Sequence, residues 1–111
     1  MYTYNAKYIK NYDGDTASFD VDLGFGITNR IVVRFLGINT KELRGTRGKD
    51  KQEAIDAKVF VENCLKDSED IVIKTVKDKK GKYGRYLATI FYDDVNLCDQ
   101  LIEEGLAVPY M

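Results

Sequence analysis

The sequence predicts a single domain of the α+β class, mainly β, with its elements in the order β-β-β-α-β-β-α. Three observations support this prediction: alternating apolar and polar residues near the start, two stretches with apolar residues at helical spacing, and a length of 111 residues. Hydrophobic residues make up 44% of the chain and charged residues 32%, a balance typical of a folded domain with one core. We therefore expect residues 1–111 to fold as one unit.

The first three predicted elements are strands. Residues 2–12 form the first, and apolar residues at alternate positions from Thr16 to Leu23 predict a second, half-buried strand. Residues 24–26 include two glycines and provide a turn, and the β-branched residues of 27–38 predict a third, longer strand. The second and third strands should pair as a hairpin.

The second half of the chain alternates between helical and strand patterns. A loop that contains glycine and arginine is predicted at residues 43–51, followed by a helix near 51–66. Strands at 71–76 and 86–92 form a hairpin, and a second helix lies between Asn96 and Gly105. The hairpin turns at residues 78–82, around Gly81. Five mainly antiparallel strands with a helix after the third have the connectivity of the OB-fold, a small Greek-key barrel that commonly binds nucleic acids or sugars.

The chain contains no histidine. This excludes Ser-His-Asp and Cys-His nucleophiles, and nucleases whose general base or metal ligand is an imidazole. The two cysteines, Cys64 and Cys98, fall on the apolar faces of the predicted helices and are too few for a zinc site without histidine. We interpret them as buried free thiols in a reducing, intracellular setting.

The formal net charge is −1 and the pI is near 5.4, so a site for a polyanion has to be a local feature of the surface. No stretch of the chain approaches the length and hydrophobicity of a membrane span, and the N-terminus has no signal-peptide pattern. We expect a cytoplasmic monomer without a membrane partner.

Polar residues gather at three places where predicted strands begin or end. The three clusters are Asp13-Gly14-Asp15-Thr16, then Arg34 with Asn39, Thr40 and Glu42, and finally Lys82-Tyr83-Gly84-Arg85. Two carboxylates within three residues suit a hard cation, although the same tetrapeptide is also an ordinary turn. The third cluster ends a stretch, residues 74–85, with six basic residues and one acidic residue. That stretch suits the backbone of a nucleic acid, or it is a solvated hairpin tip.

In this order and spacing the three clusters resemble the thermonuclease, or staphylococcal nuclease-like, family. The resemblance extends over nearly the whole chain, and it is carried mainly by residues 33–42, 82–88 and 101–107. It implies the OB-fold and Ca²⁺-dependent endonuclease activity on DNA or RNA, with little sequence preference. The substrate would be single-stranded or locally opened, and the products would end in 3′-phosphates.

The resemblance also implies a role for each site residue. Asp15 would bind Ca²⁺ through its carboxylate, Asn39 through its side chain and Thr40 through its carbonyl, with Asp13 just behind them. Glu42 would orient or deprotonate the attacking water. Arg34 and Arg85 would be the two arginines that clamp the scissile phosphate. The other substrate-binding residues implied are Lys82, Tyr83, Leu87 and Tyr110.

Two residues depart from the family pattern. Asn39 stands where the family more often has aspartate, so the site loses one negative charge and we expect weaker Ca²⁺ binding. Lys41 replaces the usual proline, and its charge would either favour ionised Glu42 or pair with it. These departures leave an alternative open, a catalytically weak or inactive OB-fold module that binds nucleic acid. A carboxylate-lysine nuclease built on Asp56 and Lys58 is disfavoured, because the pair falls within a predicted amphipathic helix.

Overall fold

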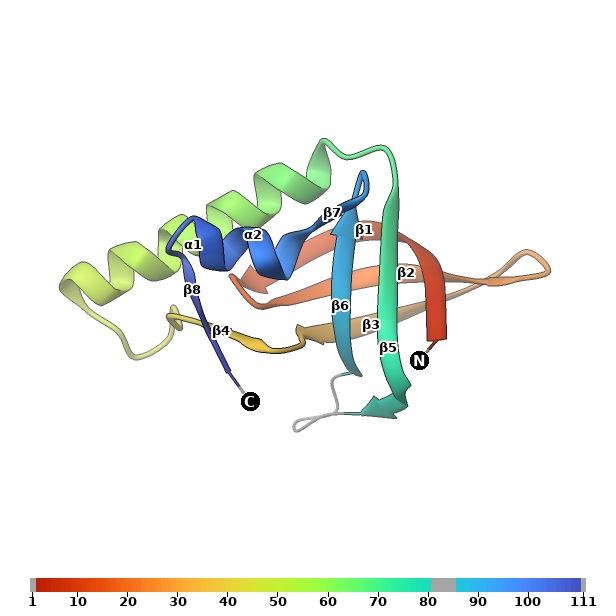
Figure 1. Cartoon of the computed structure of the whole chain (residues 1–111), viewed down its shortest axis with the longest axis horizontal. Coiled ribbons are helices and arrows are strands. Elements are labelled where there is room, and N and C mark those ends of the chain that lie inside the picture. Colours follow the sequence, from red (N-terminus) through yellow and green to blue (C-terminus); the bar gives the residue numbers. More distant parts are fainter. Residues whose placement is uncertain (1, 81–85, 111) are drawn as a thin grey trace.

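The protein is described by a computed structural model over residues 2–80 and 86–110 (Figure 1). Its elements are β1 (Tyr2–Asp13), β2 (Thr16–Gly24), β3 (Ile27–Phe35), β4 (Ile38–Thr40), α1 (Gly48–Lys66), β5 (Ile71–Lys80), β6 (Tyr86–Tyr92), β7 (Val95–Asn96), α2 (Leu97–Glu103) and β8 (Ala107–Pro109). The five longer strands and the two helices follow the predicted order, and three short strands are added to it.

The five longer strands form a closed barrel. They lie in the order β3-β2-β1-β5-β6, with each neighbouring pair antiparallel. A short parallel pairing of β3 with β6, at residues 33–35 and 86–88, joins the two ends of the sheet. This arrangement confirms the predicted OB-fold. The parallel pairing also places the end of β3 beside the start of β6, although more than fifty residues separate them in the sequence.

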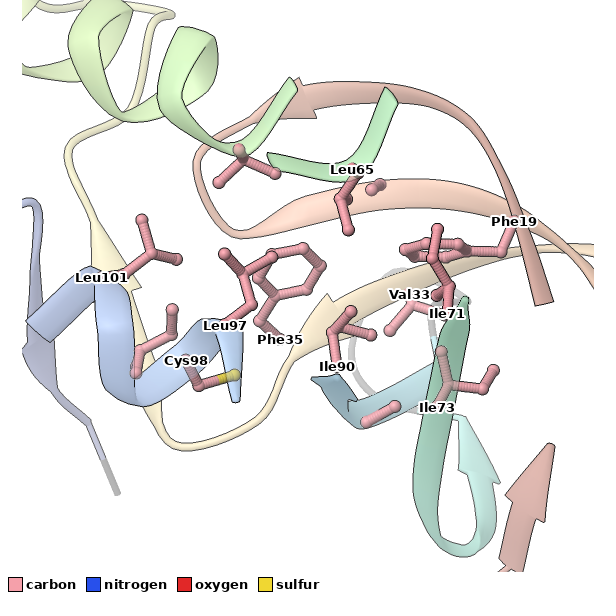
Figure 2. Close-up of a cluster of buried hydrophobic side chains, with 14 of the residues drawn as sticks. Phe19, Val33, Phe35, Leu65, Ile71, Ile73, Ile90, Leu97, Cys98 and Leu101 are labelled. Carbon is pink, nitrogen blue, oxygen red and sulfur yellow. The ribbon is translucent and has the colours of Figure 1, made fainter. Parts of the chain in front are cut away.

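The core fills the barrel and the space between the barrel and the two helices (Figure 2). Phe19 and Phe35 are its largest buried side chains, from β2 and β3. Leu65 of α1 and Leu97 of α2 pack against them from outside the sheet, and both are fully buried. Complete burial of one such side chain contributes roughly 1.5–3 kcal/mol, so the helices are held to the barrel mainly by apolar contact.

Helix α1 is fixed to the barrel next to the turn between β1 and β2. Asn11, buried at an irregular point of β1, donates from Nδ2 to the carbonyl of Lys58 in α1 (2.9 Å) and to that of Asp13 (3.2 Å). Gly14 lies so close to the helix that a Cβ added to it would be 2.6 Å from the Cβ of Ala57. The turn that carries the two acidic residues of the first cluster is therefore held between β1 and α1.

The predicted third strand, residues 27–38, is interrupted in the structure. The chain leaves β3 after Phe35 and passes through Gly37 in a left-handed conformation (φ +82°), which glycine adopts without steric cost. It then forms β4, which pairs with β8, Asn39 lying opposite Val108. The interruption turns the end of the predicted strand toward the C-terminal segment and creates the edge on which Asn39 and Thr40 lie.

Other boundaries differ by a few residues from those predicted. Helix α1 begins at Gly48 instead of near residue 51, and β5 continues to Lys80, into the predicted turn at 78–82. Leu23 is exposed instead of buried, because β1 pairs with β2 only as far as Val21 and the hairpin of β2 and β3 extends beyond the barrel (Figure 1). Among the described residues, no helix has the length and apolar character needed to cross a membrane.

The two cysteines are free thiols, Cys98 buried and Cys64 partly exposed. Burial raises the pKa of Cys98 to about 11, well above the ordinary value of 9.0. At pH 8 only on the order of 0.1% of this thiol is ionised, so we expect it to react with a disulfide reagent only when the fold opens. A Cys64→Ser variant isolates this thiol, and labelling in the native state as fast as in urea would contradict the expectation.

The same shift sets an alkaline limit to the stability of the fold. The folded state disfavours the Cys98 thiolate, so this group's contribution to stability is complete below pH 9 and is lost as the pH rises through about 11. A Cys98→Ala variant should therefore lose less of its unfolding free energy between pH 9 and 11 than the parent chain. Equal losses over that range, in parallel urea titrations, would contradict this assignment.

Candidate functional site

The site is organised around the guanidinium group of Arg34, at the end of β3. Nη1 donates to the carbonyls of Phe35 and Ile38, at 2.9 Å each, and Nη2 donates to Oδ1 of Asn39 at 3.1 Å. Nη2 also lies 3.4 Å from Oδ2 of Asp15. The side chain of Arg34 is only 16% exposed. The two carbonyls, which belong to the main-chain turn from β3 into β4, fix the plane of its guanidinium group.

The Asp15 carboxylate is buried beneath this guanidinium group, with 7% of its side chain exposed. Oδ1 accepts from the Thr16 hydroxyl and Oδ2 from the Thr40 amide, both at 3.1 Å. Asp15 also accepts at its own carbonyl from the Phe35 amide (2.8 Å). A buried carboxylate is costly unless its oxygens are satisfied, and here both are. These bonds aim the carboxylate at β4.

Asp13 supports Asp15 from behind, its Oδ1 accepting from the Asp15 amide at 3.1 Å. The pKa of Asp13 is raised from its ordinary value of 3.8 to about 6, mainly by burial and then by hydrogen bonding with, and repulsion from, the Asp15 side chain. The Asp15 amide and the Arg34 charge lower this pKa by less. The negative charge of the cluster therefore falls as the pH drops below about 6, through Asp13.

Two oxygens converge on one position of the site. Oδ2 of Asp15 and Oδ1 of Asn39 approach the same nitrogen of Arg34, at 3.4 and 3.1 Å. Both of these donors are oxygens, which suits Ca²⁺ or Mg²⁺ and not a soft metal. The hydroxyl of Thr40 is buried against Gly14 and has no hydrogen-bond partner among the described residues. Within the described ranges no group of three or more acidic or cysteine side chains is placed to hold a metal ion.

Glu42 lies just beyond β4 on an exposed part of the chain. Its carbonyl accepts from the Thr46 hydroxyl at 2.6 Å, whereas its carboxylate makes no hydrogen bond or ion pair with any described residue. The structure therefore does not join Glu42 to Arg34 or Asp15. Lys41 pairs instead with Asp50 of α1 (Nζ to Oδ1, 3.7 Å). The ion pair between Lys41 and Glu42, one of the two effects expected of Lys41, is therefore not formed.

Two residues predicted to bind substrate flank Arg34. Leu87, half-buried on β6, lies opposite Arg34 in the parallel pairing of β3 with β6. The ring of Tyr110 is 5.9 Å from Cζ of Arg34, and its amide donates to the carbonyl of Gly37 at 2.9 Å. An aromatic face at this distance from a guanidinium group gives a cation–π contact. The structure thus brings both residues to the site.

The third predicted cluster lies outside the described residues. It includes Lys82, Tyr83 and Arg85, the last of which is the predicted second guanidinium group of the site. Of the carboxylate-lysine pair weighed above, Asp56 is exposed on α1 and accepts from the side chain of Gln52 at 2.8 Å. Lys58 is half-buried, and residues two apart do not face each other on a helix, so the two do not form a carboxylate-lysine site.

Sequence reasoning missed three parts of the site. It gave no role to the Thr16 hydroxyl that binds Asp15, none to the close approach of Gly14 to α1, and none to the two carbonyls that hold Arg34. A glycine between two acidic residues was a signal, but it fits a simple turn equally well. Main-chain carbonyl acceptors cannot be identified from the sequence, because every residue has one.

The comparisons with known proteins agree with this architecture. The sequence model of the staphylococcal nuclease homologue family matches residues 32–111, which include Arg34, Asn39 and Glu42. A curated relative, the uncharacterized protein MJ1439 of Methanocaldococcus jannaschii, is 32% identical over an alignment 129 positions long, gaps included, which covers 97% of this chain. The chain spans 60% of the length of that relative. On the match to most of its length, the chain belongs to the staphylococcal nuclease homologue family.

Proposed function

We propose that this chain is a Ca²⁺-dependent endonuclease that hydrolyses phosphodiester bonds of DNA or RNA with low sequence specificity, leaving 3′-phosphates. The observation that carries the proposal is the fixed guanidinium group of Arg34, with Asp15 and Asn39 oxygens on one side and the exposed carboxylate of Glu42 two residues after the end of β4. Family membership supports a nuclease-type hydrolase.

Asp15, Asn39 and the carbonyl of Thr40 are the residues that would hold the ion, and their oxygen donors fit a hard cation. When bound, Ca²⁺ supplies Lewis-acid polarisation of a phosphoryl oxygen and neutralises charge that develops there. Binding at this position requires the Asn39 and Asp15 oxygens to exchange the nitrogen of Arg34 for the ion, because both now contact that nitrogen.

The protein side chains have two tasks in the proposed reaction. Arg34 donates to the phosphoryl oxygens through Nε and Nη2, because the carbonyls of Phe35 and Ile38 already take both hydrogens of Nη1. Nη2 becomes available when the ion replaces it at Asp15 and Asn39, and the fixed plane reduces the cost of orienting the group in the transition state. Glu42 orients the attacking water and accepts its proton. The new bond joins the water oxygen to phosphorus, and the bond to the 5′-oxygen breaks. Arg85 adds a second guanidinium group in this proposal, and water or Arg85 protonates the leaving oxygen.

The test is cleavage of long single- and double-stranded DNA and of RNA during a Ca²⁺ titration into the millimolar range. We expect cutting that stops with a chelator and in a Glu42→Gln variant, because the variant keeps the size of the side chain but not its basicity. End-labelling should find 3′-phosphates. Cutting that persists in chelator, or in Glu42→Gln at the parent rate, would contradict the proposal.

Asn39→Asp should strengthen Ca²⁺ binding. The change adds one negative charge to a position already aimed at the ion site, and a unit charge at about 4 Å in a partly exposed site is worth about 1–4 kcal/mol, which is about fivefold or more in affinity. Calorimetric titration with Ca²⁺ measures the change. An unchanged or weaker affinity would show that Asn39 does not face the ion.

The second candidate function is a nucleic-acid-binding module without catalysis. One observation favours it: in the described part of the site only one carboxylate, that of Asp15, directly faces the position shared with Asn39, and Arg34 already neutralises it. In the same assay this function predicts no cutting at any Ca²⁺ concentration, together with binding of single strands that weakens with salt.

A further inference from the structure

Residues 41–51, which we call the basic segment, connect β4 to the first turn of α1. They include five basic and two acidic residues, a net charge of +3. The whole chain has a net charge of −1, so with +3 in this segment the other residues together carry −4. The basic segment is therefore a local concentration of positive charge on an acidic protein, which is the kind of surface that a polyanion site requires here.

Two of its five cations shape the segment itself. Lys51 donates from Nζ to the carbonyl of Leu43 at 2.8 Å, and Lys41 pairs with Asp50 at 3.7 Å. The Thr46 hydroxyl adds a bond of 2.6 Å to the carbonyl of Glu42. These contacts fold the segment back on itself next to β4.

The other three cations are Arg44, Arg47 and Lys49, and all three are exposed. Over the described ranges none of them forms an ion pair or a side-chain hydrogen bond. Arg44 lies inside the turn that the Thr46 hydroxyl closes, two residues after Glu42, so their Cα atoms are at most about 7 Å apart. The free cations thus begin beside the carboxylate that we assign to the attacking water.

We propose that Arg44, Arg47 and Lys49 bind the phosphates of a single-stranded nucleic acid and extend the substrate path from the catalytic site along the basic segment. This inference rests on the proposed function for its substrate class. Guanidinium groups match phosphate geometry, and exposed cations on long side chains follow a flexible backbone. A strand held at Arg34 continues past Glu42 onto this surface, independently of base sequence.

The experiment measures binding of a fluorescent twenty-nucleotide oligo(dT) in excess chelator, over a series of salt concentrations. The triple variant Arg44→Gln/Arg47→Gln/Lys49→Gln should make the slope of log K against log salt shallower by about 2, because each lost phosphate contact contributes about 0.7 for a single strand. At low salt the dissociation constant should rise about tenfold or more. Each single variant should lower the slope by about 0.7.

A matched control removes the same charge elsewhere, with Lys7→Gln/Lys10→Gln/Lys66→Gln, at exposed positions on β1 and at the C-terminal end of α1. We expect the control to keep the parent slope. Equal slopes for the parent and the triple variant, or an equal loss in the control, would overturn the inference. Polyglutamate that competes with the oligonucleotide at equal charge concentration would also overturn it, because the surface would then bind any polyanion.

The result is separable from that of the proposed function, because binding in chelator requires no cleavage. If the parent chain cuts with Ca²⁺ but the slopes do not differ, the function stands and the extended path fails. If the parent chain does not cut at any Ca²⁺ concentration but the triple variant loses slope, the nuclease proposal fails and the binding surface stands. Circular dichroism should show equal thermal midpoints for all three proteins, because the substituted side chains are exposed.

Discussion

Arg34→Lys should lower the rate of phosphodiester cleavage by at least about a hundredfold, with little change in fold. Lysine keeps the charge but not the planar pair of donors, and removing one preorganised donor of this kind costs roughly 2.7–4 kcal/mol of transition-state stabilisation. The structure makes the loss large, because the carbonyls of Phe35 and Ile38 already fix this guanidinium group. Single-turnover cleavage of a labelled oligonucleotide at saturating Ca²⁺ measures the effect.

Arg30→Lys is the matched control. Arg30 is on the same strand and also pairs with a carboxylate, making two hydrogen bonds to Asp20 at 2.7 and 3.1 Å, but it is exposed and away from Asp15. This variant should cleave at the parent rate. If Arg34→Lys also cleaves at the parent rate, Arg34 is a structural residue of the turn, and the proposed role in catalysis is wrong.

Gly14→Ala should destabilise the fold by about 1–3 kcal/mol and misplace Asp15. The new Cβ would be 2.6 Å from the Cβ of Ala57 and 3.0 Å from two side-chain atoms of Thr40, so the helix or the turn has to move. Overpacking is the cause, because the backbone at Gly14 is not in a left-handed conformation. Urea unfolding with a chelator present measures the stability change, and Ca²⁺ titration measures the effect on the site.

A double-mutant cycle isolates the contact. Ala57→Gly removes the facing Cβ and by itself costs about 1 kcal/mol in helix propensity. If the two Cβ atoms collide, the double variant should be more stable than the sum of the single changes predicts, by about 1 kcal/mol or more. Strict additivity would show that the Gly14 substitution acts through something other than its contact with α1.

The parts of the site that are close in sequence could be predicted from residue types. Arg34, Asn39 and Thr40 lie within seven residues, and the structure brings them together as expected. The pairing of Asp15 with Arg34 also follows from local structure, because β2 and β3 form a hairpin in which Thr16 lies opposite Arg34. Here the predicted hairpin was enough to bring the first and second clusters together.

The sequence by itself determined the class, the order of the long elements and the first two clusters of the site, because alternation and helical spacing are local consequences of which face is buried. Only the tertiary structure decided the break at Gly37, the pairing of β4 with β8 and the parallel contact of β3 with β6. Three-residue strands are too short to give a period, and their pairing joins distant residues. The pairing of β3 with β6, which closes the barrel, places Leu87 beside Arg34, and the separate pairing of β4 with β8 brings Tyr110 there, so that side of the site is a product of long-range pairing.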